Sequence, residues 1–296
     1  MKIDIQSVSE DEIIFELAGV DASIANALRR IILAEVPTVA IENVWIITNS
    51  GIIQDEVLAH RVGLVPIKVD PRLLKYVQSE SGETDEDTLV FHLNVHNRNM
   101  DDVVEPGDTS TYVGPSGKVL SKHLTWIPIE TQKEIFAGGG VSVVNPDILL
   151  TKLGPGQAVE FEAHCCKGIG KDHAKFQPVA TVSYRLKPDI SFKKDDIVGG
   201  MATELKELCP TGVFDIEEMG NEVKALVAHP ERCTMCGECV RTPRWNDMVA
   251  LKRKHDTFVF TVESLGAVPP QKIVEEALKI LGTKCRNLTQ CVTTEQ

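Results

Sequence analysis

The sequence predicts an α+β fold in which both ends of the chain build one domain around an inserted β-rich domain. Two amphipathic helical patterns lie at opposite ends of the chain, over residues 21–36 and 269–288. The stretch 38–179 instead alternates apolar and polar side chains and carries long polar segments, which is typical of strands joined by loops. A core made from the two termini, with the middle inserted, is the simplest organisation that accommodates these patterns.

The first helical pattern begins at Asp21, whose carboxylate can accept hydrogen bonds from the free amides of a first turn. Ile24, Leu28 and Ile31 recur at helical spacing and form one apolar stripe. Pro37 removes a backbone donor and restricts the residue before it, so we expect the helix to end there. A helix of this length is marginal by itself, so its stripe needs a packing partner.

Further along the chain, alternating apolar residues predict strands at 12–18, 89–95 and 179–186. The last helix is expected to start at Pro269 and Pro270, because the first turn is where a missing amide costs least. Both terminal helices are expected to expose an apolar stripe. The stripe of the last helix consists of Ile273, Ala277, Leu278, Leu281, Cys285 and Leu288.

Composition excludes several classes of protein. No apolar run of the 296 residues approaches the roughly 20 that a membrane helix needs, so no membrane partner is expected. The formal net charge of −12 opposes the phosphate attraction that dominates nucleic-acid binding, so we expect no direct nucleic-acid ligand. No Walker-type loop, GxSxG, HExxH or Rossmann fingerprint is present, which argues against catalysis by this chain. The clustered cysteines favour a reducing compartment and a metal or cluster site over disulfides.

The strongest chemical pattern is Cys233-Thr-Met-Cys236-Gly-Glu-Cys239. Its two-residue spacings let three thiolates converge on one centre. Ferredoxin-type motifs place a fourth cysteine four residues after the third, but Pro243 occupies that place here. A remote ligand is therefore required for four thiolates, and Cys209 is the candidate because a proline follows it.

This pattern predicts an iron–sulfur cluster, of the 4Fe–4S or 3Fe–4S type, as the cofactor. Two alternatives stay open. One is a structural zinc site, which more often uses two Cys-x2-Cys pairs, and the other is an empty relic of a ferredoxin-like insert. We expect a bound cluster to be structural rather than redox-active, because the free energy of ligation also stabilises the fold.

Seven short segments of the chain occur together in a known family. They are NALRR at 26–30, QDE at 54–56, AHRVGLVPI at 59–67, DPRL at 70–73, TWIP at 125–128, DILL at 147–150 and KGIGKDHAKF at 167–176. Together they resemble the α-like assembly subunits of cellular RNA polymerases, a family with archaeal members and with bacterial α. They most resemble the larger α-like subunit shared by eukaryotic RNA polymerases I and III, over nearly the whole chain.

The resemblance implies a split dimerisation domain, residues 1–37 plus 180–296, with an insert domain at 38–179. A small ferredoxin-like insert, as in archaeal and some eukaryotic members, is expected at about 195–250. Family members are non-catalytic: they pair with a smaller α-like subunit and form the platform for the largest and second-largest subunits, with small accessory subunits. The predicted dimer interface consists of Ile24, Leu28, Ile31, Ile273, Ala277 and Leu281.

The resemblance further implies transcription of rRNA, tRNA and 5S RNA in the nucleus (nucleolus and nucleoplasm). Two alternatives are an archaeal orthologue, which would be cytoplasmic, and a ferredoxin-type electron carrier suggested by the cysteines alone. His60 and Arg61 are either a surface pair or a docking point for other subunits. Contact with the second-largest catalytic subunit is assigned to Lys171, His173, Lys175 and Phe176.

Overall fold

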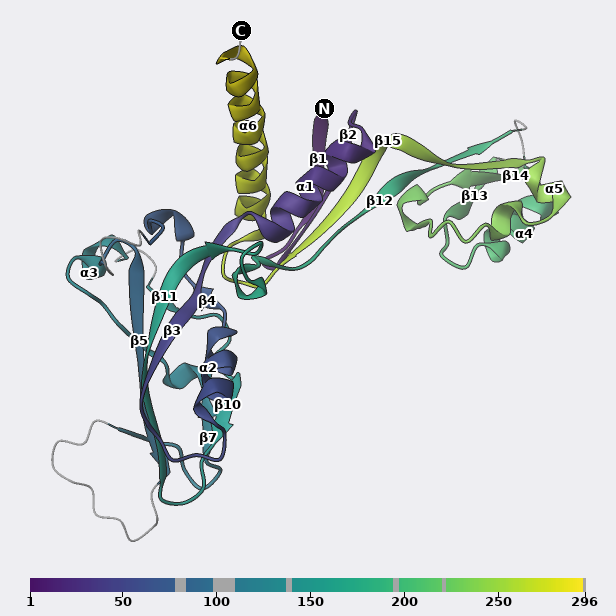
Figure 1. Ribbon diagram of the computed structural model, residues 1–296. Helices are drawn as coiled ribbons and strands as arrows, with labels where there is room; N and C mark the ends of the chain where they lie inside the picture. Colours follow the sequence, from purple (N-terminus) through teal and green to yellow (C-terminus); the bar gives the residue numbers. More distant parts are fainter. Residues whose placement is uncertain (78–83, 98–109, 137–139, 194–196, 220–221, 295–296) are drawn as a thin grey trace. The chain divides into compact units, whose positions relative to one another are not determined.

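The computed structural model describes residues 1–77, 84–97, 110–136, 140–193, 197–219 and 222–294. Helices and strands are both abundant, which confirms the predicted α+β class (Figure 1). The chain falls into two compact units, each described here by itself. The first comprises Met1–Ser7, Ile14–Asn26 and Ser183–Thr261, and the second comprises Val8–Ile13, Ala27–Val182 and Val262–Gln296. The domain boundaries expected from the sequence stay a prediction.

The larger part of a four-stranded sheet lies in the first unit, with strand order β1-β2-β15-β12. Its strands are β1 (Lys2–Val8), β2 (Glu12–Ala18), β12 (Val179–Phe192) and β15 (Val249–Ser264). Every second residue of β2 is buried, which confirms the predicted alternation. The Phe15 ring stacks on Phe260 with centroids 5.1 Å apart, and Tyr184 contacts the same Phe260 ring at 5.2 Å. Aromatic side chains thus join strands that are distant in sequence.

In the same unit, β12 and β15 continue side by side into a small subdomain (Figure 1). Its elements are α4 (Gly200–Leu208), β13 (Phe214–Met219), β14 (Glu222–Val227), η4 (Pro230–Arg232), η5 (Glu238–Val240) and α5 (Pro243–Asn246). β13 and β14 form an antiparallel hairpin. The hydrophobic core of the subdomain includes Phe214, Trp245, Cys233 and Cys239. Its likeness to a ferredoxin stays a prediction.

The second unit contains a five-stranded sheet in the order β3-β11-β5-β6, with β8 also paired to β5. β11 pairs antiparallel with both β3 and β5, so that Phe161 lies between Ile46 and Leu93. Alternate residues of β5 and β11 are buried, as an alternating sequence predicts. The strands are β3 (Pro37–Asn49), β5 (Thr88–Asn97), β6 (Thr111–Tyr112), β8 (Thr125–Ile127) and β11 (Gln157–Ile169).

One face of this sheet packs on the hydrophobic core of the second unit. Leu58 and Val62 of α2 (Asp55–Gly63) belong to that core, as do Val119 of β7 and Leu150 of β10. The remaining elements are short: β4 (Ile67–Lys68), η1 (Pro71–Leu73), β7 (Lys118–Leu120), η2 (Ser121–His123), α3 (Gln132–Ile135), β9 (Ser142–Val143), β10 (Leu149–Lys152) and η3 (Ala174–Phe176).

The first long helix, α1 (Ala22–Ala34), begins where the sequence predicts. Asp21 Oδ2 accepts hydrogen bonds from the Ser23 hydroxyl at 2.6 Å and the Ser23 amide at 3.0 Å, and these bonds lower the pKa of Asp21. The helix ends before Pro37, as predicted. The last helix, α6 (Pro270–Thr294), starts at the predicted prolines. Among the described residues, no helix combines the length and apolarity needed to cross a membrane.

Candidate functional sites

Four of the six predicted interface side chains are buried inside the chain itself. The exposed fraction is 1% for Leu28, 3% for Ile31, and 0% for both Ile273 and Ala277. The expectation that these residues form exposed stripes is therefore corrected, because the chain's own packing covers them. Ile24 is 42% exposed, and Leu281 is half-buried. The interface role of all six residues stays a prediction.

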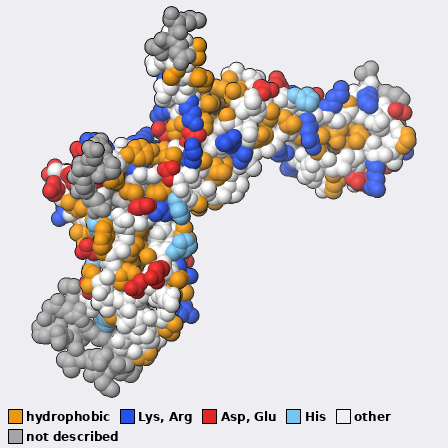
Figure 2. Space-filling view, viewed as in Figure 1, with side chains coloured by type: hydrophobic (Ala, Val, Ile, Leu, Met, Phe, Trp, Pro, Cys, Tyr) orange, Lys and Arg blue, Asp and Glu red, His pale blue; other side chains and the backbone are white. Residues whose placement is uncertain are grey.

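The described part of α6 carries a different apolar surface, which we name the α6 stripe: Leu281, Cys285, Leu288 and Val292. Their spacing of four, three and four residues places them on one helix face. Every side chain from Thr283 to Thr293 is exposed; the exposed fraction is 68% for Leu288 and 59% for Val292. Hydrophobic side chains are visible along α6 in Figure 2. An exposed stripe of this kind indicates a surface that another chain covers.

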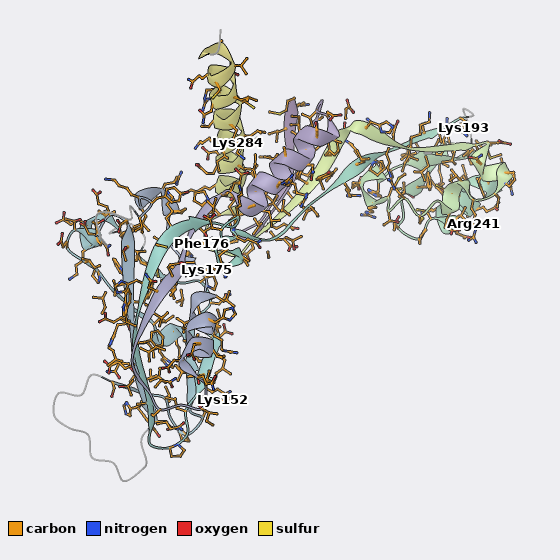
Figure 3. The ribbon with its side chains drawn as sticks, in the orientation of Figure 1. Lys152, Lys175, Phe176, Lys193, Arg241 and Lys284 are labelled. Carbon is orange, nitrogen blue, oxygen red and sulfur yellow. The ribbon has the colours of Figure 1, made fainter. Side chains whose placement is uncertain are left out.

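A polar contact holds the middle of α6 against the end of α1. Lys284 Nζ lies 2.5 Å from Glu35 Oε1, and Glu35 directly follows the last residue of α1 (Figure 3). Because this ion pair is partly exposed, it contributes little free energy. The ion pair does mark the position on α6 after which the side chains of the α6 stripe are exposed.

The four candidate ligand cysteines come from three places in the subdomain. Cys209 follows α4, Cys233 follows η4, and Cys236 and Cys239 flank Gly237 at η5. All four are among the residues that line a single small cavity of about 10 Å³. Cys233 and Cys239 are buried, whereas Cys236 is exposed. The structure thus places the remote Cys209 in the same cavity as the three motif cysteines.

The backbone around the cavity is shaped to support negatively charged sulfur. The Val213 amide donates to Cys209 Sγ at 3.4 Å, and the Met235 amide donates to Cys233 Sγ at 3.4 Å. Met235 and Gly237 adopt left-handed conformations, with φ of 60° and 81°. Positive φ is uncommon for a residue other than glycine, so the tight turn of this motif is a specific feature. Amide donors to sulfur favour the thiolate form that binds metal.

The surroundings of the cavity shift the pKa values of two of its thiols, Cys209 and Cys239. Burial, together with negative charge on Cys233, Cys209 and Cys236, raises the pKa of Cys239 to about 11. Burial also acts to raise the pKa of Cys209, but hydrogen bonds, the first from the Val213 amide, outweigh it and leave that pKa below its usual value. Thiolates that repel one another in this cavity favour binding of a positively charged group, and such a group would lower the pKa of Cys239.

The four thiols can be compared with what each candidate group needs. In a tetrahedral zinc site, bonds of about 2.3 Å place the sulfurs roughly 3.8 Å apart. Across the described part of the chain, no three His, Cys, Asp or Glu side chains come together closely enough to hold a metal ion. Both an iron–sulfur cluster and a zinc ion can take four thiolates, so the identity of the group stays a prediction.

Sequence reasoning missed Arg185, which supports the cysteine loop. From β12, Arg185 Nη2 donates to the Glu231 carbonyl at 2.8 Å, and Nη1 donates to the Cys233 carbonyl at 3.4 Å. Lys187, two residues further along β12, instead contacts Glu16 Oε2 of β2 at 2.6 Å. Arg185 therefore links the four-stranded sheet to the residues that carry Cys233. Its partners are more than 40 residues away in sequence, so no local pattern could have revealed them.

Two of the four residues assigned to contact the second-largest subunit point into the chain. Phe176 is only 5% exposed. The Lys175 side chain is 12% exposed; its Nζ donates to the Ile41 carbonyl at 2.8 Å and pairs with Glu42 (Figure 3). Internal contacts already use these two side chains, and the assignment of all four residues stays a prediction. Of the four, Lys171 and His173 are exposed.

Two glycines let the loop with these residues approach the rest of the chain. A Cβ at Gly168 would lie 2.6 Å from the Phe176 ring, and one at Gly170 would lie 2.7 Å from the Leu33 carbonyl oxygen. The Lys171 amide donates to the last carbonyl of α1 at 2.8 Å. The loop is therefore packed against α1, which fixes the exposed part in place.

Arg61 also has an internal role. Its Nε donates to the Leu150 carbonyl at 2.9 Å, and its Nη2 donates to the Leu149 carbonyl at 2.6 Å. The guanidinium thus holds β10 against α2. His60 is exposed, and a docking role for it stays a prediction.

Comparison with known proteins shows the family of the chain. The sequence model of the RNA polymerase Rpb3/Rpb11 dimerisation domain matches residues 14–285. The chain is 44% identical over 293 residues to the RNA polymerases I and III subunit rpac1 of Dictyostelium discoideum, covering 98% of this chain and 81% of that protein. It is 41% identical over 298 residues to the corresponding subunit RPAC1 of Saccharomyces cerevisiae, covering 99% and 88%.

Similarity to an RNA polymerase II subunit is lower. The chain is 32% identical over 300 residues to subunit rpb3 of Dictyostelium discoideum, covering 97% of this chain and 93% of that protein. The likeness extends through the cysteine subdomain, so a ferredoxin-type electron carrier is excluded as the function of the whole chain. The family expected from the sequence is confirmed. The chain belongs to the RNA polymerase Rpb3/Rpb11 dimerisation-domain family and is similar to the subunit that RNA polymerases I and III share.

Proposed function

We propose that this chain is a non-catalytic assembly subunit of RNA polymerases I and III that pairs with a smaller α-like subunit through the α6 stripe. The exposed stripe carries the proposal, together with membership of a dimerisation-domain family. The heterodimer is then a platform for the largest and second-largest catalytic subunits and the small accessory subunits. The polymerases that contain it act in the nucleus, including the nucleolus, and transcribe rRNA, tRNA and 5S RNA.

The stripe can supply part of the free energy of a contact. Fully burying a leucine or valine side chain is worth roughly 1.5–3 kcal/mol. Leu288 and Val292 still expose more than half of their surface, so each can contribute on the order of 1–2 kcal/mol when a partner covers it. The helix is already formed, so little conformational entropy is lost on docking.

Co-purification with the smaller α-like subunit tests this proposal. The parent chain is expected to form a one-to-one complex, measured by sedimentation. The double variant Leu288→Asp with Val292→Asp is expected to lose it, because two charges would be buried in the contact. Gln290→Asp on the opposite helix face is the matched control and should keep the complex. Equal binding by the double variant and the parent would rule out the α6 stripe as the interface.

The exposed part of the loop at 168–176 is proposed to contact the second-largest catalytic subunit. Lys171 and His173 supply this contact, because Lys175 and Phe176 are used internally. The packing of Gly170 against α1 sets the position of Lys171. Charge reversal by Lys171→Glu should weaken recovery of the second-largest subunit with an intact heterodimer, and unchanged recovery would remove this contact from the proposal.

We further infer that Cys209, Cys233, Cys236 and Cys239 hold an iron–sulfur cluster with a structural role. Their common cavity and the two amide-to-sulfur hydrogen bonds support the inference. When bound, the group would supply positive charge and thiolate bonds that join α4, η4 and η5. Zinc is the less favoured alternative.

Metal analysis of anaerobically purified chain tests the ligand set. Iron and sulfide are expected in the parent, and Cys209→Ser should lower both, whereas Cys285→Ser outside the cavity should not. Unchanged iron and sulfide in Cys209→Ser would show that Cys209 is not a ligand. Stoichiometric zinc without sulfide in the parent would replace the cluster with a zinc site.

A further inference from the structure

The five-stranded sheet of the second unit has a second face, turned away from the hydrophobic core. On β11, Phe161 and Ala163 belong to the core, so the residues that alternate with them point to the other side. The pairing register extends this second face across β3, β5 and β8. We name it the open face; its residues include Trp45, Ile47, His92, Thr125, Ile127, Glu160, Glu162 and His164.

Three large hydrophobic side chains are exposed on the open face, among polar ones. The exposed fraction is 47% for Trp45, 59% for Ile47 and 42% for Ile127. An antiparallel sheet with one solvated face normally alternates apolar residues inside with polar residues outside. η3 covers one end of the face, where Phe176 lies against Gly168, and Val90 on the same face is also buried, whereas Trp45, Ile47 and Ile127 are exposed. We take these exposed hydrophobic side chains as a candidate docking surface for another chain.

The charged side chains on the strands of the open face are mainly carboxylates. The strands β3, β5 and β8 contain no lysine or arginine. β11 contains only Lys167, whose Nζ donates to the Leu74 carbonyl at 3.0 Å. Besides Glu42, which pairs with Lys175 of η3, the carboxylates are Glu160 and Glu162, of which Glu160 lies 3.3 Å from His92 Nε2. The face is therefore acidic and aromatic.

Trp45 is positioned to receive a cation. Its ring contacts that of His164 in a tilted arrangement, with centroids 4.0 Å apart and planes at 57°, and it lies opposite Glu162 in the strand pairing. A half-exposed indole beside a carboxylate can bind a guanidinium through both its π-face and the negative charge. Trp45 was not singled out by its sequence pattern, because exposure of its ring depends on what lies over the sheet.

We propose that the open face docks a basic protein segment that combines lysine or arginine with apolar side chains. The basic groups pair with Glu160 and Glu162, and the apolar side chains cover Trp45, Ile47 and Ile127. A second copy of this face, an acidic segment or a nucleic-acid backbone would place like charges opposite one another, which opposes association. The proposal goes beyond dimerisation, because it uses none of the residues of the α6 stripe.

Site-specific photo-crosslinking identifies the occupant. A photoreactive amino acid is placed at Ile47 and, separately, at Ile127 of the full chain, and cells are illuminated before the polymerase is purified. Both positions are expected to crosslink to one segment with an excess of lysine and arginine. Leu226, which is 48% exposed in the first unit, is the control position. Yields no higher than at Leu226, or a mapped segment that is acidic or belongs to a second copy, overturn the proposal.

Charge reversal tests whether the acidic residues carry the contact. With the crosslinker at Ile47, Glu160→Lys with Glu162→Lys is expected to lower the yield roughly three- to tenfold, because two favourable pairs become repulsive. Glu217→Lys with Glu218→Lys makes the same charge change on β13 and should leave the yield unchanged. The milder pair Glu160→Gln with Glu162→Gln is used if reversal prevents folding, and should give a smaller decrease. Equal yields in the Glu160 and Glu162 variants and in the β13 control refute the proposal.

Discussion

Replacing Arg185 with methionine is predicted to loosen the loop that leads to Cys233 while leaving the sheet folded. Methionine keeps much of the apolar stem but removes the donors to the Glu231 and Cys233 carbonyls, at 2.8 and 3.4 Å. A hydrogen bond that involves a charged group contributes about 1.5–3 kcal/mol. Because Arg185 is exposed and its second bond is long, we expect the lower end, about 1.5 kcal/mol in total.

Amide hydrogen exchange measures this loosening directly. The Arg232 and Cys233 amides are bonded to the carbonyls of His229 and Pro230 within the loop. A loss of about 1.5 kcal/mol in local stability should speed their exchange roughly tenfold. Lys187→Met is the matched control, since Lys187 lies on the same strand but contacts Glu16. Unchanged exchange in Arg185→Met, or equal acceleration in Lys187→Met, would refute a specific role for Arg185.

Other residues give further predictions. Gly168→Ala should destabilise the fold by about 1–3 kcal/mol and lower Tm in a thermal melt, because its Cβ would lie 2.6 Å from the buried Phe176 ring. Gly282→Ala has no such neighbour in the described chain and should stabilise the fold by about 0.5–1 kcal/mol. Equal Tm values for the two variants would contradict both predictions. The hydrogen bond from Arg72 lowers the pKa of Asp70 to about 2. Asp70 therefore contributes stability above about pH 4 that is lost as pH falls towards 2. The unfolding free energies of the parent and of Asp70→Asn should converge over that range. A difference between these two free energies that stays constant with pH would contradict this prediction.

Features set by neighbouring residues were predicted well from the sequence. Asp21 is a helix N-cap because its partner Ser23 is two residues away. The alternation of β2 and β5 follows from local strand geometry. The spacing of Cys233, Cys236 and Cys239 likewise determines that their side chains gather around one turn.

Features that depend on distant contacts were not predicted. An amphipathic stripe shows that a helix face must be covered, but not which chain covers it, so Leu28 and Ile31 were assigned to a partner although the chain buries them itself. Lys175 looked like a surface cation because its partner Glu42 lies far away in sequence. Arg185 and Trp45 owe their roles to a sheet register that no single stretch of sequence contains.

The most direct test of assembly through the α6 stripe is the alkylation rate of Cys285, which lies on the stripe and is exposed in this chain. The rate is compared between the assembled polymerase and the unpaired chain carrying Leu288→Asp with Val292→Asp. If a smaller α-like subunit covers the stripe, Cys285 should react at least about tenfold more slowly in the polymerase, because the thiol must first be uncovered. Equal alkylation rates in the two states would contradict the assignment of α6 as the dimerisation surface.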